Sequence, residues 1–301
     1  KMGRGNALTG LVGMLAKGGS KAEAAMKAFL SFNGNISEGV VSALNSADPK
    51  VQTAALKLAS ARRIYSAYGK VIALTKSSDA SIKNAAFDAL NGVAKSNNFG
   101  DICNMLESST GDATAKLQAA AKSAIQDQTA DQQYNLVVNR LGNKAKAPLY
   151  YPLLAQAGNS QSIAKLQQEY TNGSSKEAAF NALLQVNNPE MIDVLYKLAK
   201  DNASSKDAIL ARYLTLVKNA GKSETEMYLL YSRALDLNPS AKVQSSLVSA
   251  LGSSRILPSL MLAAKYLNNQ STSFAAASTI REIVSKVASL QKGADVKAII
   301  E

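Results

Sequence analysis

The chain has 301 residues, and its 34 lysines and arginines outnumber its 22 aspartates and glutamates, which gives a formal net charge of +12 at pH 7. It contains no histidine and one cysteine, Cys103. These counts exclude zinc sites of the Cys/His type, an internal disulfide, and nucleophiles activated by histidine. We therefore expect no catalytic residue, metal site or cofactor in this chain.

Helical patterns begin near Asn6, and the stretch 48–59 (DPKVQTAALKLA) shows them most clearly. Asp48 can accept hydrogen bonds from the N–H groups of a first helical turn, and Pro49 suits the next position because it lacks an N–H. Val51 then starts an apolar stripe that continues three, four, seven and eight residues later, as on one face of a helix. Within the stripe, Ala54 and Ala55 let a neighbouring helix come close, so Ala55→Arg, or Ala86→Arg in the next copy, should destabilise the fold.

The stripe recurs along the chain at intervals of 29 to 35 residues, which is the signature of a repeat architecture. Its first residues are Ala22, Val51, Ile82, Leu117, Ala147, Lys176, Ile209, Val243 and Ser273. A second set of helical patterns lies between the copies, for example at residues 69–76, 133–141, 190–200 and 224–237. Each unit is thus predicted to be two antiparallel helices that bury their apolar faces by stacking on the next pair.

These patterns predict an all-α protein: a right-handed α-solenoid, or superhelix, of about nine antiparallel helix pairs in a single domain, residues 1–301. The alternatives are an ordinary helical bundle with chance similarity and two globular domains. Prolines fall at expected helix starts, except Pro152, which interrupts the fifth copy and predicts a kinked or late-starting helix. Ser20 with Glu23, and Ser223 with Glu226, have the spacing of capping boxes. A further helix is expected to begin at Asp295, which suggests a fragment of a longer chain.

The period, the Asp48-Pro49 start and the Ala54-Ala55 pair resemble HEAT repeats, especially the short bacterial kind found in phycobilin lyases. Gln52 stands where such repeats usually carry arginine, so the ladder of Asp and Arg side chains typical of many HEAT arrays is not expected. Tetratricopeptide repeats are the second resemblance, because residues 228–239 (YLLYSRALDLNP) look like the end of one. Only that single copy supports it.

A basic concave face is the candidate binding surface, because the second helices of stacked pairs line the concave side and several carry lysines. The candidate residues are Lys27, Lys57, Arg62, Arg63, Lys83, Lys116, Lys122, Lys144, Lys146, Tyr150, Tyr151, Lys176 and Lys242. Arg62 and Arg63 alternatively place favourable positive charge at a helix C-terminus. The group from Lys144 to Tyr151 belongs to the interrupted fifth unit, which marks either a ligand groove or simple drift. The alternative to a binding surface, for the whole set, is a solvated, lysine-rich surface without a ligand.

The preferred function is a non-catalytic scaffold that binds a protein, a peptide or a neighbouring domain of the same polypeptide. The style of the sequence also resembles the HEAT region of exported bacterial proteins that carry a 3-keto-disaccharide hydrolase-type domain, which implies a periplasmic or secreted location. A cytoplasmic location is the alternative. Nucleic-acid binding through the basic face is the second hypothesis, and an enzyme based on paired carboxylates is the third. No apolar run is long enough to span a membrane.

Overall fold

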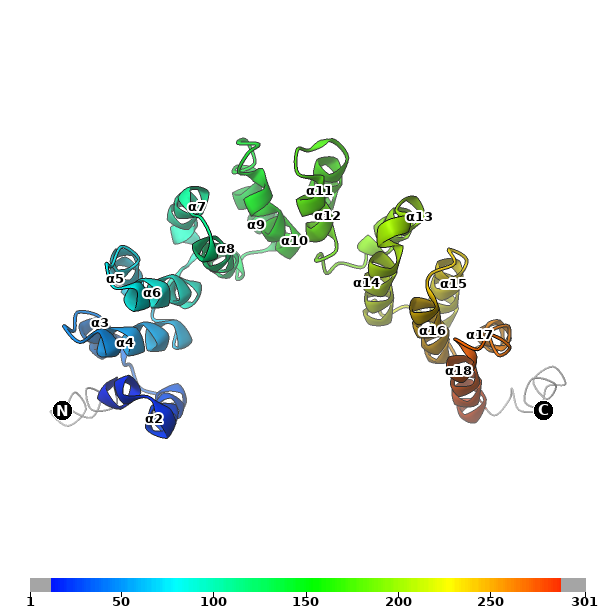
Figure 1. The fold of residues 1–301 in the computed structure, drawn as a ribbon, viewed down its shortest axis with the longest axis horizontal. Coiled ribbons are helices and arrows are strands. Elements are labelled where there is room, and N and C mark those ends of the chain that lie inside the picture. Colours follow the sequence, from blue (N-terminus) through cyan, green and yellow to red (C-terminus); the bar gives the residue numbers. More distant parts are fainter. Residues whose placement is uncertain (1–11, 288–301) are drawn as a thin grey trace. The chain divides into compact units, whose positions relative to one another are not determined.

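The computed structural model describes residues 12–287 of the chain. Every regular element in this range is a helix, and the range contains no strand (Figure 1). The all-α fold class predicted from the sequence is therefore confirmed for this part of the chain. The beginning of the helix predicted from Asn6, and the helix predicted from Asp295, lie outside the described residues.

The helices form two compact units, divided between Ala179 and Phe180 within helix α12 (Lys176–Leu183). In the first unit, a helix at residues 12–17 is followed by further elements in this order: α2 (Gly19–Ser31), α3 (Ser37–Ala43), α4 (Pro49–Ala61), η1 (Tyr65–Ala67), α5 (Tyr68–Leu74), α6 (Ala80–Val93), η2 (Ser96–Asn98), α7 (Phe99–Ser108), α8 (Asp112–Ile125), α9 (Ala130–Val138), η3 (Ala147–Tyr150), α10 (Tyr151–Ala157) and α11 (Ser160–Asn172).

Helices of the first unit lie in two layers. Helices α4, α6, α8 and α10 pack on one another in sequence and form one layer, while α3, α5, α7 and α9 each pack against the helix that follows (Figure 1). One alanine of each pair, Ala55, Ala86 and Ala120, is fully buried, as expected for the apolar stripe. Small side chains at such positions allow neighbouring helices to approach closely.

The second unit contains α13 (Met191–Asp201), η4 (Ala203–Ser205), α14 (Lys206–Asn219), α15 (Glu224–Leu235), α16 (Ala241–Ala250), η5 (Leu251–Ser253), α17 (Leu257–Ala264) and α18 (Ser273–Lys286). Within this unit, α14, α16 and α18 pack in sequence, and α13, α15 and α17 each cover the helix that follows. Its core includes two large rings with less than 2 % exposure, Tyr213 and Tyr231.

Helix starts follow the predicted chemistry in most cases. The Asp48 carboxylate accepts a hydrogen bond from the Lys50 N–H at 2.9 Å, and Ser223 and Glu226 form a reciprocal capping box at the start of α15. The capping box predicted for Ser20 and Glu23 is wrong. Helix α2 begins earlier, at Gly19, and so places Ser20 inside its first turn, while Gly18 occupies the cap position without a side-chain bond.

The interruption predicted at Pro152 is confirmed. A 3₁₀ turn, η3, occupies Ala147–Tyr150, and the α-helical geometry of α10 starts only at Tyr151. Pro152 therefore falls in the first turn, where a proline removes no helical hydrogen bond.

Several polar side chains donate hydrogen bonds to backbone carbonyls that lie about one repeat length away in the sequence. In the first unit, the Gln118 side chain donates to the Leu149 carbonyl, 31 residues away, at 2.9 Å. In the second unit, Lys206 donates to the Leu237 carbonyl and Thr279 to the Val248 carbonyl, each also 31 residues away. Such bonds satisfy carbonyls at helix ends and fix one helix pair against the next.

Candidate functional site

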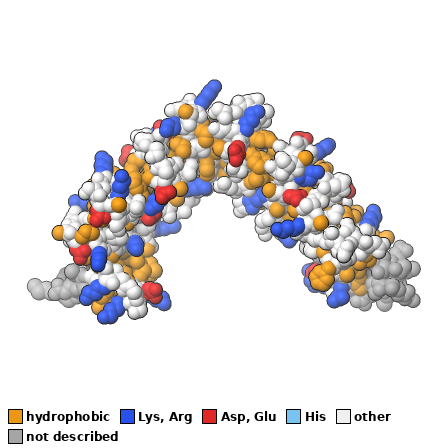
Figure 2. Space-filling model, in the orientation of Figure 1, with side chains coloured by type: hydrophobic (Ala, Val, Ile, Leu, Met, Phe, Trp, Pro, Cys, Tyr) orange, Lys and Arg blue, Asp and Glu red, His pale blue; other side chains and the backbone are white. Residues whose placement is uncertain are grey.

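Some side chains of the predicted basic face form bonds within the fold, and others are exposed. All of them except Lys242 belong to the unit that ends at Ala179. Lys27, Lys57 and Lys83 are exposed on α2, α4 and α6. Lys144 and Lys146 precede η3, and Lys176 and Lys242 lie in the first turns of α12 and α16. On the face shown in Figure 2, lysine and arginine side chains are dispersed among uncharged and hydrophobic ones.

Arg62 forms a structural bridge to the end of α2. Its Nη1 donates to the carbonyls of Phe29 at 2.9 Å and Phe32 at 2.8 Å, and its Nη2 donates to the carbonyl of Gly34 at 3.3 Å. A guanidinium placed there satisfies the unpaired carbonyls and the negative end of the α2 dipole. Arg62 therefore joins two helix pairs, and this favours the structural interpretation of this residue.

Lys116 is also engaged within the fold. Its ammonium group lies 2.9 Å from the Asp88 carboxylate and 3.3 Å from the Asn84 carbonyl, so it connects α8 to α6. A lysine held in this way has little freedom to follow an external ligand.

Tyr150 and Tyr151 lie in the core, which corrects their prediction as part of a binding face. Their exposed fractions are 0 % and 1 %. The Tyr150 hydroxyl donates to Glu107, and the Tyr151 hydroxyl donates to Glu169 at 2.7 Å. Burial, reinforced by these carboxylates, raises the pKa of both phenols. Large rings bury much apolar surface, and each polar tip has an acceptor, so both side chains stabilise the interior.

A continuous hollow lies at the C-terminal ends of α4, α6 and α8. It consists of two adjoining cavities of about 290 and 370 Å³, which share Arg63, Gly92, Ser123 and Gln126. Further side chains from Ser60, Asn91, Lys95, Lys122, Asp127 and Gln156 line it. We call this hollow the polar groove.

The backbone at the end of α4 shapes this groove. The Ile64 N–H bonds to the Ala59 carbonyl at 2.9 Å and the Arg63 N–H bonds to the Ser60 carbonyl at 3.1 Å, which is the Schellman pattern. Arg63 has a φ of 50°, in the left-handed region where glycine is usual. Gly92, in the last turn of α6, lies so close that an added Cβ would sit 2.2 Å from the Ser60 carbonyl oxygen.

One register position of the repeat supplies a row of polar side chains to the groove. Ser60, Asn91, Gln126 and Gln156 each follow the first residue of their apolar stripe by nine positions, and all four line the same cavity. Sequence reasoning missed this row because it searched for charged residues. The signal was present as the recurring uncharged polar residue at the ninth position.

The cations in the groove differ from those that bridge helices. Neither the Arg63 guanidinium nor the Lys122 ammonium forms an ion pair or side-chain hydrogen bond with the described residues. Burial lowers the pKa of Lys122. Lys95, which sequence reasoning also missed, lies 4.1 Å from the centroid of the Tyr65 ring, a cation–π contact that orients its ammonium group. Asp127 supplies the carboxylate of this lining.

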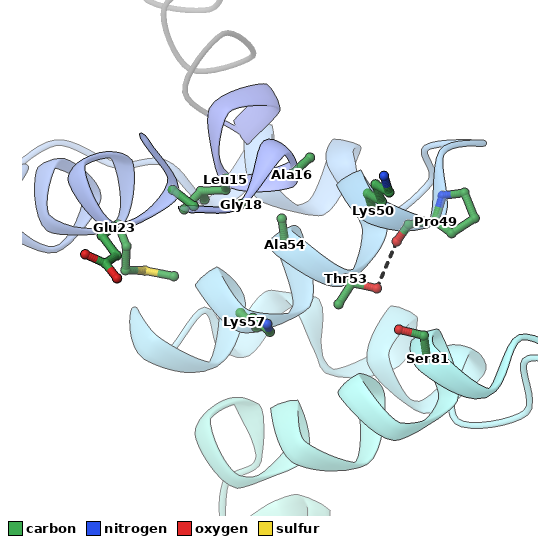
Figure 3. A pocket seen from close by; sticks show the side chains of 12 residues that line it. Leu15, Ala16, Gly18, Glu23, Pro49, Lys50, Thr53, Ala54, Lys57 and Ser81 are labelled. Carbon is green, nitrogen blue, oxygen red and sulfur yellow. Dashed lines mark hydrogen bonds between the residues drawn. The ribbon is translucent and has the colours of Figure 1, made fainter. Parts of the chain in front are cut away.

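A second, mainly apolar cavity of about 570 Å³ lies near the start of the described chain. Figure 3 shows Leu15 and Ala16 on one side of it and Ala54 of α4 on another, with Lys50 and Lys57 on the same helix. The Thr53 hydroxyl donates to the Pro49 carbonyl at 2.8 Å and is therefore already engaged. Among the residues of the predicted basic face, Lys57 alone lines this cavity, where it lies next to apolar surface.

Between residues 12 and 287, no group of three or more His, Cys, Asp or Glu side chains is arranged to hold a metal ion. None of the helices in that range combines the length and hydrophobicity needed to cross a bilayer.

Comparisons with known proteins add no family assignment. A scan against models of protein families and a search of curated proteins found no match to this chain.

Proposed function

We propose that this chain is a non-catalytic interaction module, built as a HEAT-like α-solenoid in which helix pairs continue through both units. The sequential packing of α4, α6, α8 and α10, and separately of α14, α16 and α18, supports this architecture. The side-chain bonds to carbonyls 31 residues away support a regular step between pairs. The right-handed superhelix and an extracytoplasmic location remain part of the proposal.

The observation that carries the function is the polar row in the groove. Ser60, Asn91 and Gln126 offer hydrogen-bond donors and acceptors at one register position of three successive units. In the fourth unit, the Gln156 amide nitrogen donates to the Lys122 carbonyl at 2.9 Å and to the Gln133 side chain at 3.3 Å, so this residue offers its amide oxygen. Helices that pack 8–10 Å apart would space these side chains by about the length of three residues of an extended peptide. A repeated amide or hydroxyl at that step suits the repeating N–H and C=O groups of an extended polypeptide. The partner is therefore an extended segment of another protein or of a neighbouring domain.

Peptide selection tests this function. Random peptides displayed on phage would be selected on the purified chain, and the enriched peptides would be measured against the double variant Asn91→Ala/Gln126→Ala. We expect enriched peptides to lose about tenfold in affinity, since two hydrogen bonds of roughly 0.5–1.5 kcal/mol each are removed. The matched control is Gln161→Ala/Gln167→Ala, which removes exposed amides of α11 outside the groove. Failure to enrich any peptide, or equal binding by the groove variant, would refute the proposal.

Nucleic-acid binding remains the second candidate, because Lys27, Lys57 and Lys83 are exposed on helices α2, α4 and α6. The engagement of Arg62 and Lys116 inside the fold and the dispersed cations in Figure 2 weaken it. Duplex DNA that binds at low salt and dissociates steeply as salt rises would support this candidate. Absence of binding at low salt would remove it.

A further inference from the structure

We infer that the polar groove selects acidic peptides, with peptide carboxylates pairing with Arg63 and Lys122 while the polar row contacts the peptide main chain. This inference rests on the proposed peptide-binding function and specifies the chemistry of the partner. The inference follows from a difference among the cations. The fold bonds some of them internally and leaves others without a partner in the polar groove.

Arg63 gives the first argument. Its neighbour Arg62 forms hydrogen bonds to four carbonyls at and just after the end of α2, whereas Arg63 is exposed and has no side-chain partner among residues 12–287. Its backbone adopts a φ of 50°, which a glycine would adopt without the steric cost of a side chain. The α4 dipole favours positive charge at this helix end, but no hydrogen bond or ion pair with residues 12–287 holds the Arg63 side chain. This side chain provides five N–H donors in a planar arrangement that matches a carboxylate.

Lys122 gives the second argument. It lies in α8, lines the same cavity as Arg63, and is half-buried without an acidic partner. A partly desolvated ammonium group interacts more strongly with an anion than one in bulk water does. The lowered pKa of Lys122 agrees with that environment. An incoming carboxylate would restore the interaction that burial removes.

Lys95 extends the charge to the other end of the groove, where the Tyr65 ring orients it. The three cations come from the ends of α4, α6 and α8, and the lining contains one carboxylate, Asp127. This balance is complementary to a negatively charged segment. Uncharged side chains of the polar row between the cations favour a peptide, which has amide groups to pair with them, over a uniformly charged polyanion.

The test uses a fluorescein-labelled peptide of roughly 12 residues with the repeat Gly-Glu-Ser, which places a carboxylate once per expected helix-pair step. Binding to the complete chain is measured by fluorescence anisotropy at low salt. We expect the glutamate peptide to bind at least about tenfold tighter than the same peptide with glutamine. Arg63→Gln and Lys122→Gln should each weaken binding about three- to fivefold, the range for partly exposed ion pairs. Lys70→Gln and Lys200→Gln are matched controls at exposed lysines outside the groove and should leave binding unchanged.

The outcomes separate this inference from the function on which it rests. Equal binding of the glutamate and glutamine peptides, or equal binding by the groove variants, overturns the acidic preference. If phage-selected peptides still depend on Asn91 and Gln126 in that case, peptide binding stands and only the preference falls. An oligothymidylate of similar length that binds tighter than the glutamate peptide, and that Arg63→Gln weakens, overturns the inference in favour of a phosphate ligand. Circular dichroism spectra identical to that of the original chain verify that each variant is folded.

Discussion

At the scale of single residues, Arg62 and Arg63 illustrate how neighbouring side chains of the same type acquire different roles. Both follow the last turn of α4. The Arg62 side chain reaches back to the end of α2, where unpaired carbonyls attract it. The Arg63 side chain leaves the helix in a left-handed backbone conformation and extends into the groove. The two residues are of the same type and carry the same charge, so the sequence alone does not distinguish them. The local geometry assigns their roles.

Arg63→Gly should stabilise the fold while weakening acidic-peptide binding. Glycine adopts a φ near 50° without steric cost, so the free energy of unfolding should rise by up to about 1 kcal/mol. Urea denaturation measures this change. Arg63→Ala keeps the strain and is the control for loss of the side chain. A clear loss of stability in Arg63→Gly would show that the arginine side chain supports the fold and would contradict our interpretation.

Glu226 should titrate far below an ordinary glutamate. Hydrogen bonds from the Ser223 N–H, the Ser223 hydroxyl and Lys222 lower the pKa of its carboxyl group from 4.5 to about 2. The ionised capping box therefore stabilises the fold above about pH 4.5, and this contribution is lost as the pH falls toward 2. Carbon-13 NMR of the carboxyl groups measures the titration. Ser223→Ala removes the hydroxyl donor and should move the pKa upward; a pKa near 4.5 in the original chain would contradict the prediction.

At the scale of elements, contacts between successive helices depend on small residues at defined positions. Ala55 and Ala86 have no exposed surface, and Gly92 places the end of α6 against the end of α4. The alanines could be predicted from the apolar stripe, because their spacing puts them on the buried face of a helix. The role of Gly92 could not, since it depends on the position of Ser60 in a different helix.

Ala55→Arg and Ala86→Arg should each destabilise the fold strongly. Each places an unpaired charge in a closed helix contact, for which the cost is on the order of 3–5 kcal/mol. Thermal unfolding followed by circular dichroism measures the loss. Ala61→Arg makes the same substitution at an exposed position of α4 and should have little effect. If the buried variants melted at the temperature of the original chain, the predicted register of the stripe would be wrong.

Gly92→Ala should also destabilise, although alanine favours helices. The new Cβ would lie 2.2 Å from the Ser60 carbonyl oxygen, which the backbone of α4 holds in place. Relieving this overlap should cost about 1–3 kcal/mol and displace the wall of the polar groove. Gly69→Ala in α5 is the matched control, because a Cβ there meets nothing within 4 Å. It should leave stability unchanged or raise it by up to about 1 kcal/mol. Equal effects of the two substitutions in chemical denaturation would refute the clash.

At the scale of the whole molecule, the described residues form two compact helical units, and the proposed solenoid would join them in one array. About nine helix pairs packed 8–10 Å apart would extend for roughly 90 Å. A compact globule of this length would instead have a radius of gyration of about 19 Å. Small-angle X-ray scattering should therefore give a radius of gyration clearly above that value. A value near 19 Å would favour the alternative of a helical bundle or of closely associated globular domains.

The sequence by itself determined the helical class, the positions of most helices and the interruption at Pro152. These features depend on local chemistry: helix caps, the fixed φ of proline, and an apolar stripe whose period matches the α-helix. The sequence also limited the chemistry available to the chain, since histidine is absent. Each of these statements concerns residues within about one helix length of one another.

Only the tertiary structure decided which polar side chains are free to bind a ligand. Arg62 and Lys116 are bonded to carbonyls more than 30 residues away, and the Tyr150 and Tyr151 rings are enclosed by the core. Arg63 and Lys122, which are 59 positions apart in the printed sequence, line one groove. Charge and residue type cannot reveal this division, because it depends on distances between helices that local sequence does not specify.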